Sequence, residues 1–292
     1  MPTSAEVQPV RRLWLFAHFD RNGEFADYVV ETLRRYRSIG GDIVVSTTAR
    51  LTAEARASAI ASSDVLIERP NVGLDFASWK TAIDSISSLR QYEEVVIVND
   101  SIYGPLYSIS NIFEKIRNNK IPVHGLTINA EVRPHIQSYF VVFNMRVFSW
   151  ELFDSFWDEV RVLQDKREII LKYEIGLSDF LVANGFELSA AFNPLATNGR
   201  SRFWLWFCQS LPSNIFDVST WKLLFFTQLR RRSNPTIYHW FELLDCGVPF
   251  VKVELLRSNP AKANLFPLRL CLAGRDKVYF AMIARHLRDC SR

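Results

Sequence analysis

The side chains best suited to chemistry in this sequence follow a short apolar run. In VVIVNDSIYGPL, residues 95–106, the run leads directly into Asn99, Asp100 and Ser101, and the chain then bends at Gly104. Three oxygen-bearing side chains at a strand end can hold a hard divalent cation, which in turn neutralises a diphosphate leaving group. The alternative is an Asx turn that only ends the strand. The motif alone does not choose between the two interpretations.

A second polar stretch, RPNVGLDFASWK at residues 69–80, leads into an amphipathic helix. Gly73 permits unusual backbone angles or a close approach by a ligand, and Asp75 stands where a helix N-cap is expected. Exposed N–H groups at a helix N-terminus attract phosphate, and Asn71 and Asp75 could hydrogen-bond a sugar or a base. A turn followed by a cap would also account for these residues.

Other candidate groups are more scattered. The segment KYEIGLSDFL, residues 172–181, places Glu174 and Asp179 near the expected start of a helix. Either carboxylate could act as a general base if it faced a cleft, and a solvated or capping role is the alternative. His135, just before the run YFVVF, could bind phosphate or a metal, or could be a structural residue.

The elements that must position these groups alternate between two periodicities. Apolar runs alternate with segments whose large residues recur at helical spacing, which favours an α/β fold with a mostly parallel sheet covered on both faces. In such a sheet ligands bind outside the carboxyl ends of the strands, so His18 and Asp20, after the first run, join the candidates. The predicted strands are 13–18, 43–46, 65–67, 95–98, 123–128 and 139–143, and the predicted helices are 25–36, 51–62, 76–86, 147–163 and 173–184.

Composition excludes several classes of protein. The 292 residues are 48% hydrophobic and carry a net charge of only +4, which argues against disorder and against a nucleic-acid partner. No G-x-G-x-x-G, G-x-x-x-x-G-K-[ST] or G-x-S-x-G motif is present, so dinucleotide, P-loop and hydrolase sites lack support. The four cysteines form no CxxC pair, and no secretory leader or long apolar span appears, so we expect a reducing, cytoplasmic compartment.

The last third of the chain has a different character. From about residue 201 aromatic residues crowd into FWLWF and WKLLFF, and Arg230, Arg231 and Arg232 follow. A buried pair of helices is one interpretation, and an interfacial helix on an anionic membrane surface is the other. We therefore expect a core at residues 1–200 and a helical, aromatic-rich region at 201–292 that completes the same domain.

Four ordered segments resemble the rhamnan synthesis protein F family of bacterial polysaccharide glycosyltransferases. They are LFAHFDRNGEFADYVVETL, RPNVGLDFASWK, VVIVNDSIYGPL and NPTIYHWFELLDCGVPFVKVELLRSNP, which together span about residues 13–260. The resemblance implies a GT-A type fold, in which loops after the early strands hold a nucleotide sugar.

The resemblance also implies roles for the candidate residues. His18 and Asp20 would lie near the nucleotide base; Asn71, Gly73 and Asp75 would contact the sugar nucleotide. Asn99, Asp100 and Ser101 occupy the place of the Asp-x-Asp metal motif, but only Asp100 is acidic. Asp100 would then bind Mg²⁺ or Mn²⁺, or hydrogen-bond the sugar directly. Lys252 and Arg257 are possible diphosphate partners or solvated charges, and Glu174, with Asp179 behind it, is the expected base.

Membership of that family would imply transfer of a deoxyhexose, L-rhamnose from dTDP-rhamnose, onto a cell-surface or lipid-linked glycan. Inversion at the anomeric carbon and work at the inner face of the plasma membrane are part of this expectation. Because the second Asp of the metal motif is missing, a noncatalytic nucleotide- or carbohydrate-binding module is the alternative.

Overall fold

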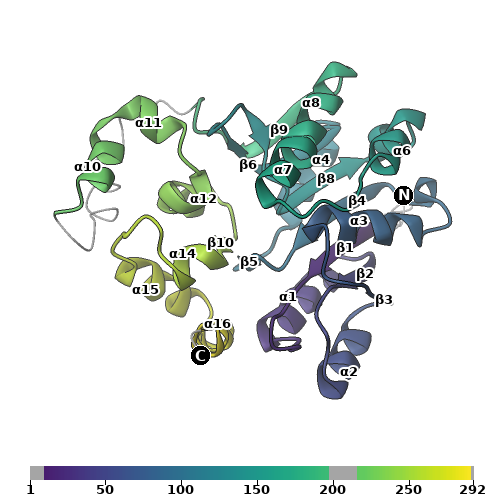
Figure 1. Ribbon diagram of the computed structural model, residues 1–292, viewed down its shortest axis with the longest axis horizontal. Helices are drawn as coiled ribbons and strands as arrows, with labels where there is room; N and C mark the ends of the chain where they lie inside the picture. The colour runs from purple at the N-terminus through teal and green to yellow at the C-terminus, as the bar shows by residue number, and fades with distance from the viewer. Residues whose placement is uncertain (1–9, 197–215, 291–292) are drawn as a thin grey trace, which may run out of the picture.

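The computed structural model describes residues 10–196 and 216–290 of the chain. A twisted sheet with helices on both faces forms one side of the molecule, and the C-terminal helices gather on the other side (Figure 1). The cysteines Cys246, Cys271 and Cys290 are free thiols, and Cys208 lies outside the described residues.

The first half of the sheet is parallel. β1 (Arg12–His18) pairs in parallel with β2 (Asp42–Thr47) on one side and with β4 (Glu94–Asn99) on the other. β3 (Val65–Glu68) extends the sheet beyond β2, also in parallel. All seven residues of β1 are buried, as expected for a strand with helices on both faces.

The second half of the sheet is mixed. β8 (Phe140–Asn144) runs antiparallel to both β4 and β6 (Val123–Asn129), and β7 (His135–Ile136) pairs antiparallel with the end of β6. β9 (Leu188–Phe192), which the sequence pattern did not indicate, pairs in parallel with β6. The expected α/β class with a mostly parallel, helix-flanked sheet is confirmed, with the antiparallel β8 as its main departure.

The two faces of the sheet bury separate hydrophobic clusters. On β1, Trp14 and Phe16 belong to one cluster, while Leu13 and Leu15 belong to the other, because successive side chains of a strand point to opposite faces. Buried residues of α1 (Asp27–Arg37), α2 (Ala53–Ser62), α4 (Ser110–Asn118) and α16 (Lys277–Asp289) complete the first cluster. Those of α3 (Leu74–Asp84), α5 (Met145–Phe148), α6 (Glu151–Asp158), α7 (Lys166–Ile169), η2 (Ile170–Ile175) and α8 (Gly176–Ala183) complete the second.

Two predicted helices differ from those observed. The predicted helix 147–163 is broken at Ser149 and Trp150 and ends at Asp158, so it is two short helices, α5 and α6. The helix predicted from residue 173 begins earlier, at Lys166, where the side chain of Asp165 accepts a hydrogen bond from Glu168 N. The segment that carries Glu174 is therefore a π-helical turn inside a longer helical stretch, and is not a helix start.

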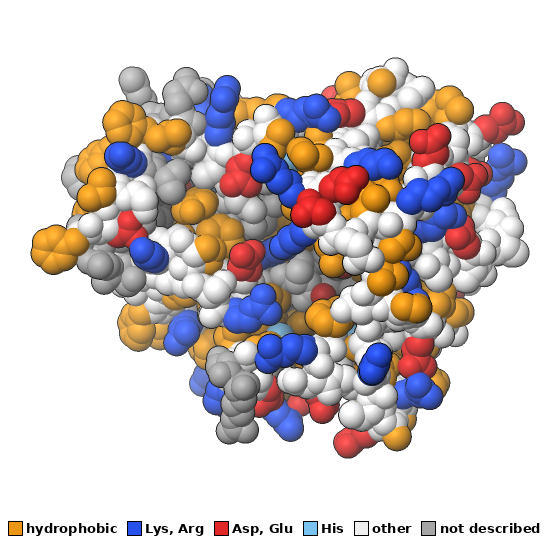
Figure 2. Space-filling model, viewed as in Figure 1, with side chains coloured by type: hydrophobic (Ala, Val, Ile, Leu, Met, Phe, Trp, Pro, Cys, Tyr) orange, Lys and Arg blue, Asp and Glu red, His pale blue; other side chains and the backbone are white. Residues whose placement is uncertain are grey.

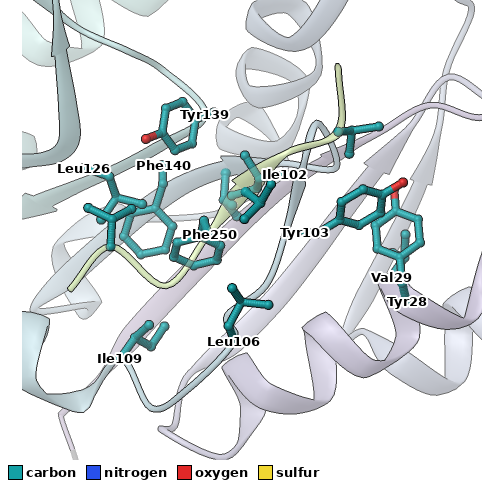
Figure 3. Close-up of a cluster of buried hydrophobic side chains, with 14 of the residues drawn as sticks. Tyr28, Val29, Ile102, Tyr103, Leu106, Ile109, Leu126, Tyr139, Phe140 and Phe250 are labelled. Atoms are coloured by element: carbon teal, nitrogen blue, oxygen red, sulfur yellow. The ribbon is translucent and has the colours of Figure 1, made fainter. Parts of the chain in front are cut away.

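The C-terminal region is tied to the sheet by a small ribbon. β10 (Val251–Lys252) pairs antiparallel with β5 (Ile102–Tyr103), which follows β4 almost at once. Phe250, just before β10, packs against Phe140 of β8, and the two rings lie among buried residues of β5 and the following loop (Figure 3). This ribbon carries Lys252 to the end of β4.

The remaining elements are short helices. They are η1 (Leu89–Gln91), α10 (Val218–Phe225), α11 (Thr227–Arg231), α12 (Pro235–Tyr238), α13 (Trp240–Asp245), α14 (Val253–Arg257) and α15 (Phe266–Arg275). Within residues 10–196 and 216–290, no helix combines the length and the apolar character that crossing a bilayer requires. The boundary expected near residue 200, and the segment FWLWF, lie outside the described residues.

Candidate functional site

A cavity of about 730 Å³ lies at the carboxyl ends of β1 and β4, between the sheet and the C-terminal helices. Figure 2 shows the molecule hollowed between these two parts, with both basic and acidic side chains around the hollow. Nine of the candidate residues named from the sequence line this cavity: Asp20, Asp75, Asn99, Asp100, Ser101, His135, Glu174, Lys252 and Arg257. The fold thus gathers the polar residues that follow β4 with candidates from distant segments.

A chain of hydrogen bonds organises the turn after β4. Asn99 Nδ2 donates to Asp75 Oδ2 over 2.8 Å, and Asn99 Oδ1 accepts from Ser101 Oγ over 2.5 Å and from its backbone N–H. Lys252 Nζ then donates to Ser101 Oγ over 2.7 Å. The Asx turn considered from the sequence is thus present, and it also links a carboxylate to an ammonium group across the cavity wall.

Asp100 occupies the centre of this wall. Its Oδ2 accepts a hydrogen bond of 2.7 Å from Phe19 N, and its backbone carbonyl accepts one from the hydroxyl of Tyr28. Burial, reinforced by the negative charges of Asp75 and Asp20, raises the pKa of Asp100 to about 8 although the Phe19 N–H and Lys252 oppose this shift. The protein surroundings of Asp100 therefore disfavour its charged form, and a cation bound there would favour it.

Burial also disfavours the charged forms of two neighbours of Asp100, Asp75 and Lys252. Burial raises the pKa of Asp75, although the hydrogen bond from Asn99 and the charge of Lys252 oppose this change. Burial likewise lowers the pKa of Lys252, whose ammonium lies 5.2 Å from the ring centre of Tyr139. Groups whose charged forms are disfavoured by their protein surroundings are typical of sites that bind or react with charged ligands.

A second group of polar side chains lines the cavity around Glu174, whose charge adds to the effect of burial on the pKa of Asp75 and opposes the effect of burial on the pKa of Lys252. Glu174, on the π-helical turn, accepts a 2.9 Å hydrogen bond at Oε2 from Ser138 Oγ, and its Oε1 lies 3.3 Å from Nε2 of His135. His135 Nδ1 lies 2.8 Å from the carbonyl oxygen of Arg133. Burial lowers the pKa of His135, but the hydrogen bonds and charge of Glu174 and the Arg133 carbonyl outweigh it, so the net shift is upward.

The C-terminal helices close the cavity near β1. His286 on α16 lies 2.7 Å from the hydroxyl of Tyr103 through Nδ1, and its Nε2 is 3.3 Å from Cys290 Sγ. The side chain of Asp20 is used within its own turn, where Oδ1 accepts from Asn22 N and Glu24 N. Arg257 on α14 lines the same end, so the cavity has a basic wall built largely from the C-terminal region.

Four predicted site residues do not line the cavity. His18 is buried, with Nδ1 2.8 Å from the Thr47 hydroxyl and its ring against Phe25, and burial lowers its pKa to about 4. Asn71 is an exposed loop residue. Asp179 pairs with Arg133 on the surface, where 47% of the Asp179 side chain is exposed.

Gly73, the fourth, has a steric role. Its φ is +73°, and a Cβ there would approach the Cβ of Ala77 to 2.7 Å and meet Val162. The expectation that Asp75 caps α3 is wrong: Gly73 is the N-cap, and Asp75 sits in the first turn, where its side chain accepts from Asn99. Gly73 thus starts the helix whose first turn carries Asp75 next to Asn99.

Sequence reasoning missed the amide-rich wall beside Glu174. Gln137 Oε1 accepts from the Thr127 hydroxyl, and Gln137 Nε2 donates to Asn234 Oδ1 over 3.3 Å. Asn129, Glu131 and Ser138 line the same wall. The polar residues just before the apolar run 139–143 could have indicated this wall. They lie beside the carboxyl end of β4 because β8 runs antiparallel to β4, and the sequence does not show that direction.

The residues present could hold a cation only if a bound ligand supplied some of its coordinating atoms. Among residues 10–196 and 216–290, no three His, Cys, Asp or Glu side chains form a metal-binding group. The oxygens of Asn99 and Ser101 are engaged with each other, and Lys252 already places a positive charge beside them. Asp100 fits the mode in which Mg²⁺ takes one or two carboxylates and completes its shell with phosphate oxygens and water.

Several known proteins are similar to this chain at low sequence identity. The virulence protein VirA of Vibrio anguillarum is 29% identical over 203 residues, which cover 68% of this chain and 64% of VirA. Core-mannan synthase A of Aspergillus fumigatus, in an Mn/GDP form, is 11% identical over 54% of this chain and 65% of that one, with a TM-score of 0.31. A cytidylyltransferase of Leptospira borgpetersenii is 14% identical over 87% of this chain and 96% of that one, with a TM-score of 0.37.

The chain thus spans less than two thirds of the length of VirA. A family model does match more than half of this chain, over residues 43–220, which include the turn after β4, the amide-rich wall and Glu174. That model describes rhamnan synthesis protein F, and the chain belongs to the rhamnan synthesis protein F family.

Proposed function

We propose that this protein is a glycosyltransferase that moves a sugar from a nucleotide donor to a polysaccharide acceptor. One observation carries the proposal: a single cavity holds an acidic and amide-bearing turn, a basic wall and a separate carboxylate, Glu174. The turn and the basic wall suit a sugar diphosphate, and the separate carboxylate suits the activation of an incoming hydroxyl. Membership of the rhamnan synthesis protein F family supports polysaccharide synthesis as the setting.

The donor would lie across the turn after β4. Lys252 and Arg257 line the cavity on the side of the C-terminal region, where their charges can stabilise a departing diphosphate. Asp75 and Asn99, which are hydrogen-bonded to each other, offer an acceptor and an amide to the hydroxyl groups of the sugar. Asp100 would hold a divalent cation that, when bound, withdraws charge from the diphosphate.

Glu174 is the proposed general base. It lines the cavity, and 18% of its side chain is exposed, while Asp179 lies on the surface outside the cavity. Glu174 would take the proton of the acceptor hydroxyl as the new C–O bond forms at the anomeric carbon. The bond from that carbon to the phosphate oxygen breaks at the opposite face, and its electron pair leaves with the nucleoside diphosphate, which inverts the anomeric centre.

The donor and acceptor follow from the family as part of the same proposal. We assign L-rhamnose from dTDP-rhamnose, transferred to a cell-surface or lipid-linked glycan, because rhamnan is named in the family description. Contact with the inner membrane surface is supported by exposed apolar side chains on and near α10 and α11. They are Phe216, Val218, Phe225, Phe226 and Leu229.

A ligand panel and one variant test the assignment. Thermal unfolding would be followed with dTDP, UDP, GDP and their sugar conjugates, each with and without Mg²⁺ or Mn²⁺. A ligand at about 100 times its dissociation constant adds about 2.7 kcal/mol to the free energy of unfolding. We expect selective stabilisation by dTDP-rhamnose, and we expect Asp100→Ala to stay folded but to transfer no sugar.

Other results would change the assignment. Stabilisation by GDP-sugars alone would replace the donor but keep the mechanism. Normal turnover by folded Asp100→Ala would show that Asp100 has no role in sugar transfer. Nucleotide binding without hydrolysis or transfer to any acceptor would favour a noncatalytic binding module. That module is the alternative function because the turn after β4 has a single acidic residue.

A further inference from the structure

The surroundings of His135 fix where its protons must be. The ring is buried, with 3% of the side chain exposed, and both nitrogens face oxygen atoms. Nδ1 lies 2.8 Å from the carbonyl oxygen of Arg133. Because a carbonyl oxygen can only accept, Nδ1 must carry a proton.

The second nitrogen faces a carboxylate. Nε2 lies 3.3 Å from Glu174 Oε1, while the other oxygen of Glu174 accepts from Ser138 Oγ. With Nδ1 already protonated, a neutral ring would leave an unprotonated, buried Nε2 3.3 Å from a carboxylate oxygen, and two acceptors at that distance repel each other. A proton must therefore lie between His135 and Glu174.

We infer that His135 is a positioning residue that carries a second proton toward Glu174 and holds this carboxylate ionised and oriented in the cavity. The Ser138 hydroxyl donates a hydrogen bond to Oε2 of Glu174, and the imidazolium lies at ion-pair distance from Oε1. Each oxygen keeps a further lone pair, and the side chain is partly open to the cavity. The carboxylate is thus kept in the only form that can accept a proton from an acceptor hydroxyl.

The other charged groups near His135 agree with a charged ring. Glu131, two residues before Arg133, adds a second negative charge that raises the pKa of His135. The guanidinium of Arg133 is paired with Asp179 of α8, which offsets its repulsion of the ring. The inference about Glu174 as a base rests on the proposed glycosyl transfer, but the proton on His135 does not.

The remaining histidines make this proton measurable. The chain has five histidines, and burial lowers the pKa of the other four, His18, His124, His239 and His286. In the intact protein labelled with ¹⁵N-histidine, long-range ¹H–¹⁵N spectra between pH 5 and 9 report the charge of each ring. We expect one histidine to remain an imidazolium at pH 7, and its signals to vanish in His135→Gln.

Variants of the two nearby carboxylates test the cause. Glu174→Gln should move the His135 midpoint below its ordinary value near 6.5, because burial then dominates. Glu131→Gln, which removes a carboxylate from the same wall without touching the ring, should move it less. A neutral His135 at pH 7 in the unaltered protein overturns the inference, and so does equal charging in Glu174→Gln. If Glu174→Gln does not fold, the unaltered protein alone decides.

Kinetics then separate positioning from general structural support. Gln at position 135 keeps an N–H for Glu174 but carries no charge. We expect His135→Gln to lower kcat about tenfold, to leave the donor Kd unchanged, and to remove the loss of activity at alkaline pH that deprotonation of His135 causes. An equal loss at every pH would contradict the role. A charged His135 in a protein that transfers no sugar would retain this proton assignment while refuting the proposed function.

Discussion

Two carboxylates that line the cavity have different surroundings. Asp100, after β4, is half-buried beside other carboxylates, and desolvation raises its pKa to about 8. Glu174, on the π-helical turn, accepts a hydrogen bond from the Ser138 hydroxyl and lies 3.3 Å from an imidazole nitrogen of His135. The part of the cavity around Asp100 therefore favours the arrival of positive charge, and the part around Glu174 holds a carboxylate between a hydroxyl and an imidazole. This difference matches a division between binding a charged donor and activating a neutral acceptor.

Loss of the Glu174 carboxylate should have the largest effect. We expect Glu174→Gln to lower kcat by about 10² to 10⁴, the usual contribution of a general base, with donor binding retained. Transfer to a glycan acceptor and donor titration by calorimetry would be measured on the same preparation. Glu187→Gln, on the loop before β9, is the matched control. If Glu174→Gln loses donor binding but keeps kcat, Glu174 belongs to the donor site and is not the base.

Loss of the Lys252 ammonium should act on donor binding. Lys252 donates a charged hydrogen bond to Ser101 and lines the cavity. Hydrogen bonds to charged groups contribute about 1.5 to 3 kcal/mol, so Lys252→Met should weaken the donor about 10- to 150-fold. Lys277→Met, on the exposed start of α16, should leave affinity unchanged. If Lys252→Met lowers kcat and leaves donor affinity unchanged, the charge of Lys252 does not contribute to binding the diphosphate before the reaction.

The pH dependence of stability should distinguish the two carboxylates without any substrate. The pKa of Asp100 is about 8 in the folded protein and near 3.8 when unfolded, so its penalty is absent below about pH 4. The penalty grows as pH rises, because the unfolded chain ionises first, and it is complete above about pH 8. In metal-free buffer, Asp100→Asn should therefore be stabilised relative to the unaltered protein at pH 8.5, on the order of 2 kcal/mol, and little changed at pH 4.

Chemical denaturation at both pH values checks this prediction. A variant that is destabilised at pH 8.5 would mean that the hydrogen bond from Phe19 N outweighs the cost of burial. The result would also weaken the contrast between the two carboxylates, since Asp100 would then be a favourably held carboxylate like Glu174.

Asp179 should show the smallest effect. It is exposed and its ion pair with Arg133 lies outside the cavity, and exposed pairs contribute about 0 to 1 kcal/mol. We expect Asp179→Asn to change kcat and donor affinity less than about twofold and to lower the free energy of unfolding by under about 1 kcal/mol. A loss of kcat comparable with that of Glu174→Gln would restore Asp179 as a base.

The contrast between these carboxylates also explains what the sequence revealed. The turn after β4 was predictable because an apolar strand runs straight into Asn99, Asp100 and Ser101, and a strand end in an α/β sheet is a place for ligands. Glu174 was predictable only as an isolated carboxylate, because its partners His135 and Ser138 lie more than 30 residues away. The antiparallel direction of β8 brings His135 and Ser138 to the edge of the sheet where β4 ends, and no local sequence pattern indicates that direction.

Local chemistry by itself determined the α/β class, most of the strands and the polar residues of the turn after β4. Hydrophobic periodicity and strand-end composition are properties of neighbouring residues, so the sequence displays them directly. Only the tertiary structure decided that Gly73 is the N-cap of α3 and that Asp75 accepts a hydrogen bond from Asn99. It also decided that Lys252 reaches Ser101, because β10 pairs with β5 across about 150 residues of chain. Such contacts depend on the packing of distant segments, which no local spacing records.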